Sequence, residues 1–154
     1  MINKTINLVF TTIVMMLISI TVFAESKDNA IMELTRQDIP ISEKSLENSI
    51  EKGDIRVVNL LIDAGLSPNS KCADGYPILS FAVLSGKTDI AKSLIARGAD
   101  VNAEGPRTGR NPSGYNAGGT PIFFAAMTGN TEILKLLIAK GADVNAKMTV
   151  GMTP

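Results

Sequence analysis

Two short sets of residues could in principle carry out chemistry. Gly86-Lys87-Thr88 has the form of the end of a phosphate-binding loop, in which backbone amides and a lysine hold a phosphate. That motif also needs a glycine where Phe81 stands and a strand before it, so we do not expect nucleotide binding. Cys72 is the single cysteine, and the chain has no histidine that could activate it as a nucleophile.

The composition also argues against catalysis and against a metal site. Without histidine the chain lacks the commonest metal ligand and the side chain best suited to proton transfer near neutral pH. Asp100 and Asp143 recur with the period of an internal repeat, which marks them as turn residues. We therefore predict a protein that is not an enzyme and that uses no cofactor, metal or small-molecule substrate. With 15 basic and 15 acidic side chains, it lacks the basic excess that nucleic-acid binding requires.

Residues 1–24 have the pattern of a signal peptide. No charged residue lies between Lys4 and Glu25, and the intervening run is rich in Leu, Val, Ile, Phe and Met. We predict cleavage near Ala24, a periplasmic or secreted location in a bacterium, and an N-terminal lead-in over residues 25–41. The alternative is an uncleaved membrane anchor, since the uncharged stretch approaches the roughly 17 to 25 residues of a membrane span.

The rest of the chain repeats itself with a regular spacing of glycines. Each of three glycine series advances once by 33 residues and once by 43. The spacing therefore predicts a 33-residue unit with ten residues inserted once, between residues 102 and 118. The series are Gly53, Gly86 and Gly129; Gly65, Gly98 and Gly141; and Gly75, Gly118 and Gly151.

Each unit has the pattern of two short helices followed by a turn. Apolar residues at helical spacing predict helices over residues 55–64, 78–85, 88–97, 121–128 and 131–140. Gly65, Gly98 and Gly141 follow three of them, where a left-handed residue ends a helix. Helices this short are stable only when they stack on their neighbours, so we expect an all-α solenoid. The predicted core includes Phe81, Leu94, Phe124, Leu137 and Ile138.

The unit resembles the ankyrin repeat. Residues 118–129, with the sequence GGTPIFFAAMTG, match the family's Gly-x-Thr-Pro-Leu-His pattern followed by Ala-Ala and Gly. Residues 75–86 match more loosely, because Pro77 falls one position early, and a degenerate unit begins near Ser42. The resemblance implies an ankyrin-repeat solenoid of helix-turn-helix units with β-turn tips. Its repeats would span residues 42–74, 75–117 with the insertion, 118–150 and, in part, 151–154.

Two features depart from the family pattern. The histidine that bridges neighbouring repeats is replaced by Ser80 in one unit and by Phe123 in the next, so the stack should depend more on apolar contacts. The pattern restarts at Met148 and stops at Pro154. We therefore expect a truncated or partial form of a longer repeat protein, in which one flank of the third unit is uncovered.

The resemblance implies a protein partner that is bound by the concave face and the turn tips. Carried over by position, the candidate contact residues are Asp74, Tyr76, Leu84 and Met127. An alternative is that Leu84 and Met127 only pack against a neighbouring turn. A host-directed secreted effector and a maturation or accessory factor for a periplasmic haem enzyme are the other functions that the resemblance leaves open.

The inserted segment, residues 105–116, is the part that the family pattern does not explain. Its glycines and prolines predict an extended turn that projects from the tip region. Arg107, Arg110 and Tyr115 are residue types favoured at interfaces, so we predict a contact finger. A loop insertion without function accounts for the same residues.

Overall fold

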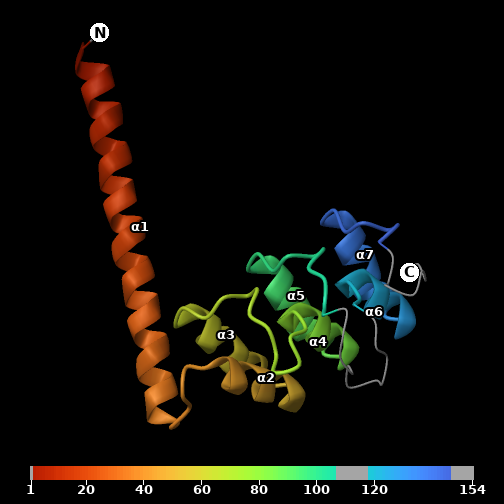
Figure 1. The fold of residues 1–154 in the computed structure, drawn as a ribbon. Coiled ribbons are helices and arrows are strands. Elements are labelled where there is room, and N and C mark those ends of the chain that lie inside the picture. The colour runs from red at the N-terminus through yellow and green to blue at the C-terminus, as the bar shows by residue number, and fades with distance from the viewer. Residues whose placement is uncertain (1, 107–117, 147–154) are drawn as a thin grey trace.

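The computed structural model describes residues 2–106 and 118–146, and in these it contains seven helices and no strand (Figure 1). The predicted contact residues Arg107, Arg110 and Tyr115, and the partial fourth repeat, lie outside the described residues. The helices are α1 (Ile2–Arg36), α2 (Glu43–Lys52), α3 (Ile55–Asp63), α4 (Ile78–Leu84), α5 (Thr88–Ala96), α6 (Pro121–Met127) and α7 (Thr131–Ala139).

The six short helices form two layers. Helices α2, α4 and α6 pack side by side in one layer, and α3, α5 and α7 in the other, so each helical pair stacks on the next (Figure 1). The five helices predicted by apolar spacing begin at the predicted residues and end one residue earlier. The all-α solenoid is thereby confirmed.

Local sequence accounts for where these helices begin and end. The side chains of Ser42 and Asp54 accept hydrogen bonds from the backbone amides three residues later, and so cap the first turns of α2 and α3. Asn130 does the same for α7. Gly65 and Gly98 lie in the left-handed region, with φ of 113° and 88°, as the prediction of helix ends requires.

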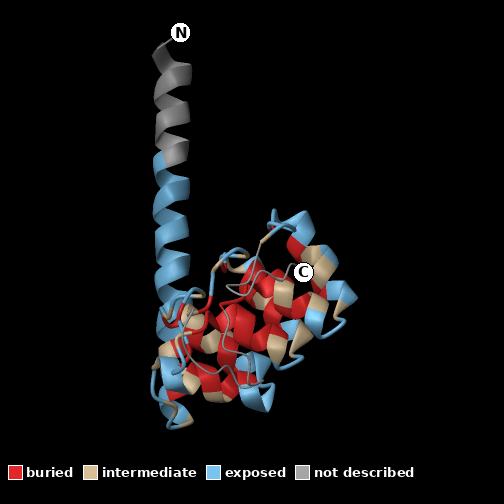
Figure 2. Cartoon of the chain, turned by 45° about the vertical axis from the view of Figure 1, so that its right-hand side comes forward, coloured by how far each residue is buried: buried red, intermediate tan, exposed pale blue. Residues whose placement is uncertain are grey.

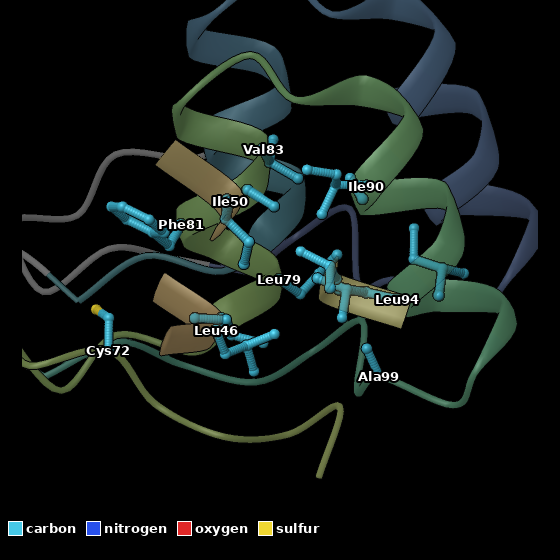
Figure 3. Close-up of a cluster of buried hydrophobic side chains, with 14 of the residues drawn as sticks. Leu46, Ile50, Cys72, Leu79, Phe81, Val83, Ile90, Leu94 and Ala99 are labelled. Carbon is cyan, nitrogen blue, oxygen red and sulfur yellow. The ribbon is translucent and has the colours of Figure 1, made fainter. Parts of the chain in front are cut away.

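The hydrophobic core lies between the two layers (Figures 2 and 3). Leu94 and Leu137 are fully buried, and Phe81 and Phe124 are buried as well, which confirms four of the five predicted core residues. The prediction for Ile138 is wrong, because 49% of it is exposed. Its equivalent one unit earlier, Ile95, is only 6% exposed. Helix α5 is followed by the helical pair α6 and α7, whereas no described helix follows α7.

Helix α1 consists of a free part and a packed part. Every residue from 13 to 29 is exposed, whereas Ala30 and Leu34 are buried in the core of the repeat domain (Figure 2). The helix continues without a break through residues 25–36, where the sequence predicts only a lead-in. Among the described helices, none combines the length and the hydropathy that a membrane span needs.

Candidate protein-binding surface

The turn tip of the second unit is a tight hairpin. The Cys72 amide donates to the Tyr76 carbonyl at 2.9 Å, and the Gly75 amide donates to the Cys72 carbonyl at 2.8 Å. Gly75 has φ of 80°, a conformation that a side chain would strain. Asp74 is exposed at this tip, and its role as a contact residue stays a prediction.

The inserted residues lie within the equivalent tip of the third unit. There the Gly105 amide donates to the Gly119 carbonyl at 3.2 Å, and these two residues are the repeat equivalents of Cys72 and Tyr76. Three residues separate the second unit's pair, and thirteen separate Gly105 from Gly119. The same backbone hydrogen bond therefore joins the two ends of each turn tip, and the sequence between those ends is ten residues longer in the third unit.

Tyr76 supports the base of this enlarged tip and is not an exposed contact residue. Only 3% of it is exposed, which corrects the prediction that it presents its ring to a partner. A Cβ at Gly105 would lie 2.4 Å from the Tyr76 ring, and the ring meets Phe124 edge to face with centroids 6.1 Å apart. Burial also raises the pKa of Tyr76. The signal that could have indicated this packing is the glycine at position 105, which leaves room for the ring.

The other predicted contact residues reach solvent to different degrees. Leu84, the last residue of α4, is half-buried against the core, so the alternative of local packing accounts for part of its surface. Met127, the last residue of α6, is 40% exposed. Both lie at the same end of the layer formed by α2, α4 and α6, one unit apart.

Cys72 is poorly placed for chemistry. It is buried at the base of the second tip, and burial raises the pKa of its thiol. The unreactive protonated form is therefore favoured. In residues 2–106 and 118–146, no three side chains of the His, Cys, Asp or Glu type come together as a metal site.

A ladder of asparagines, which the sequence interpretation missed, holds successive turns in register. The Asn69 side chain accepts from the Asp100 amide at 2.7 Å, and Asn102 accepts from the Asp143 amide at 2.8 Å. Asn102 also donates to the Gly141 carbonyl at 3.1 Å. The signal was the asparagine that recurs at each turn. These bonds fix the spacing between units and hence between neighbouring tips.

Comparison with known proteins agrees with this architecture. The family pattern described as ankyrin repeats, in three copies, matches residues 46–148, about two thirds of the chain. A solenoid of stacked helical hairpins is the class that the fold defines. The chain belongs to the ankyrin repeat family, whose members are generally non-catalytic protein-interaction modules.

Three relatives from distant organisms match parts of the chain. A putative ankyrin repeat-containing protein of Treponema pallidum is 42% identical over 69 residues, 45% of this chain and 23% of the relative. The inactive serine/threonine-protein kinase TEX14 of Mus musculus is 33% identical over 63 residues, 41% of this chain and 4% of that protein. The putative ankyrin repeat protein FPV223 of fowlpox virus is 40% identical over 52 residues, 34% and 37% of the two chains. The chain thus spans less than two fifths of each relative's length.

Proposed function

We propose that this protein is a non-enzymatic binding module of the bacterial cell envelope, which recognises a protein partner through its concave face and turn tips. The observation that carries the proposal is the enlarged third tip. This tip has ten extra residues between Gly105 and Gly119. The backbone hydrogen bond between these two residues is equivalent to the one between Cys72 and Tyr76 in the second tip. An insertion of this kind adds contact surface without altering the stack behind it.

The proposed contact surface combines the tip with the end of the layer formed by α2, α4 and α6. Asp74 and Met127 are exposed there, and Leu84 is half-buried. Arg107, Arg110 and Tyr115 of the insertion complete the surface. Arginine and tyrosine combine a large contact area with directional hydrogen bonds, and they often dominate the binding energy of an interface.

Export of the protein is the second part of the proposal. Residues 1–24 would direct the chain across a membrane and would be removed near Ala24. Two observations support this. Residues 13–23 are mostly apolar and are exposed all around the helix, a pattern typical of a segment that does not belong to a soluble fold. Residues 13–24 also lie before Ala30, the first residue of α1 that is buried in the core, so their removal leaves the buried residues in place.

The binding experiment compares the enlarged tip with a matched control. A partner would be identified by cross-linking in the native envelope, purified, and titrated against the wild type and a variant with Arg107, Arg110 and Tyr115 replaced by alanine. We expect a loss of at least about 2 kcal/mol, roughly a thirtyfold rise in Kd. The control carries Lys135→Ala and Lys140→Ala, in α7 and directly after it, in the layer formed by α3, α5 and α7. Its Kd should equal that of the wild type. Equal binding by all three proteins would contradict a role for the insertion.

A deletion variant separates binding from stability. Removing residues 107–116 leaves three residues between Gly105 and Gly119, the same number as in the second tip. It also keeps glycine at position 105, where a side chain would collide with Tyr76. We expect this variant to fold with an unchanged or slightly higher unfolding midpoint, because a shorter loop costs less closure entropy. Its affinity for the partner should fall with that of the alanine variant.

A further inference from the structure

We propose that the end of α1 and the turn after it, residues 30–39, form an antiparallel cap that closes the first unit of the stack. Ala30 and Leu34, four residues apart on one face of the helix, are buried, and Ile31 and Ile39 pack partly buried against the same core. These residues therefore belong to the repeat domain and not to a lead-in.

The direction of α1 against α3 follows from three pairs of neighbouring residues. Lys27 lies beside Gly65, which directly follows α3, Ala30 and Leu60 line a shared groove, and Glu33 forms an ion pair with Arg56. Residue numbers rise along α1 as they fall along α3, so the two helices are antiparallel.

The outer helices of the repeats, α3, α5 and α7, run in a different direction relative to one another. Between α3 and α5, the Ser93 hydroxyl donates to the Asn59 side chain at 2.6 Å, and Arg97 binds Asp63, with one N–O distance of 3.3 Å. Both contacts pair residues 34 positions apart, so these helices run parallel. Helix α1 therefore does not continue the repeat pattern. It occupies the side of α3 that a preceding outer helix would otherwise cover, in an orientation that no repeat uses.

The outward face of the cap differs from that of an outer helix. Met32, Thr35 and Arg36 are exposed on it. The surface of α3 that the cap covers includes the apolar residue Leu60, which lines a groove together with Ala30. The cap thus replaces an apolar flank with a largely polar one, which keeps the end of a solenoid soluble.

An electrostatic cluster reinforces the cap. Glu33 accepts hydrogen bonds from Arg36 at 2.9 and 3.0 Å and from Gln37 at 2.7 Å, and it also binds Arg56 of α3. These bonds, led by the one from Arg36, lower the pKa of Glu33 to about 2. The carboxylate therefore stays ionised at any physiological pH.

The position of the cap is compatible with signal removal, a step that rests on the proposed export. Cleavage after Ala24 leaves five residues, roughly 8 Å of helix, before Ala30. Glu25 and Asp28 would then lie in the first turn of the shortened helix, where negative charge is favourable. The cap itself does not depend on this step, because Ala30, Glu33 and Leu34 are all residues that cleavage retains.

The test substitutes one buried and one exposed residue of the same helix in the full-length chain. Leu34→Asp places a charge in the core, whereas Met32→Asp alters a residue that is 66% exposed. After export and purification, each protein is measured by light scattering, denaturant unfolding and intact mass. We expect Leu34→Asp to self-associate through the uncovered flank of α3 and to unfold at a lower denaturant concentration. Met32→Asp should match the wild type.

Several results would overturn the cap. One is a monomeric Leu34→Asp protein with the wild-type unfolding midpoint, and another is an intact mass showing that the exported chain starts after Leu34. If Leu34→Asp yields no folded protein, Glu33→Arg and Arg56→Glu decide the question. Each single substitution should lower the unfolding midpoint, and the double variant should restore it. A double variant that is no more stable than the single variants would contradict the ion pair between α1 and α3. A mass that retains residues 1–24 would refute signal cleavage and leave the comparison of midpoints valid.

Discussion

The two ends of the helical stack differ in what covers them. At the first unit, α3 is covered by the antiparallel end of α1, which buries Ala30 and Leu34. At the third unit, Ile138 of α7 is 49% exposed, although its repeat equivalent Ile95 is only 6% exposed. The two isoleucines occupy the same position in nearly the same helix. We attribute the difference to the neighbouring units, because α5 contacts helices on both sides, α3 and α7, and no described helix follows α7.

Polar residues show the same contrast between covered and uncovered positions. Asn102 bridges to the Gly141 carbonyl and the Asp143 amide of the next unit, whereas Asn145 has no such counterpart among the described residues. Lys92 of α5 binds Glu132 of α7 at 2.6 Å, and this bond raises the pKa of Lys92. Matched substitutions at equivalent positions can therefore measure how much each interface between units contributes to stability.

The largest effects are expected at the fully buried leucines of the outer helices. Leu94→Ala and Leu137→Ala each remove a side chain with no exposed surface and should lower the free energy of unfolding by about 2 to 5 kcal/mol. Leu94→Ala should cost at least as much, because α5 has a helical pair on either side of it. Chemical denaturation measures both values. Unchanged midpoints would show that the helix register is wrong.

A pair of isoleucine variants tests the contrast between the two positions directly. Ile95→Ala should cost about 2 to 5 kcal/mol, because it opens a cavity between two units. Ile138→Ala should cost less than about 1 kcal/mol, since a half-exposed side chain loses little burial. The measurement is again equilibrium unfolding in denaturant. Equal losses at both positions would mean that Ile138 is covered in solution.

The asparagine ladder gives a smaller contrast of the same kind. Asn102→Ala removes two hydrogen bonds to the next turn and should destabilise the protein by about 1 kcal/mol, because such exposed bonds contribute modestly. Asn145→Ala should have no measurable effect on the unfolding midpoint. A larger loss for Asn145→Ala than for Asn102→Ala would contradict the assignment of the ladder.

The smallest effect concerns the cap and depends on pH. Because the pKa of Glu33 falls from 4.5 to about 2 on folding, its contribution to stability is complete above pH 4.5. It is lost as the pH falls toward 2. The unfolding midpoint of the wild type should therefore decline across this window more steeply than that of Glu33→Gln, which cannot titrate there. Parallel declines in the two proteins would show that Glu33 is not paired in the folded state.

The repeated part of the fold could be predicted closely from the sequence. Three glycine series and the apolar spacing located five helices to within one residue, because each unit repeats the same local pattern. The cap could not be predicted in this way. Its apolar residues begin only five residues after the predicted signal peptide and lie outside the repeated units. The burial of Leu34 depends on an antiparallel docking of α1 that no repeat pattern encodes.

The inserted segment could be located from the sequence, whereas the packing of the candidate contact residues could not. Equivalent spacing placed the insertion at a turn tip, and the hydrogen bond between Gly105 and Gly119 agrees with that placement. The role of Tyr76 was not predictable, because it depends on the absence of a side chain at Gly105, 29 residues further along the chain. Arg107, Arg110 and Tyr115 stay predictions.

Hydrogen exchange of the purified protein, followed by mass spectrometry, tests most directly whether one end of the stack is closed by the cap. Peptides that cover residues 30–36 should exchange as slowly as those of α3, because the two helices would open together. Peptides from α7 should exchange faster than those from α5, which has a helical pair on both sides. Rapid exchange of residues 30–36 together with slow exchange of α3 would contradict the cap. It would favour the original prediction that these residues are only a lead-in to the repeat domain.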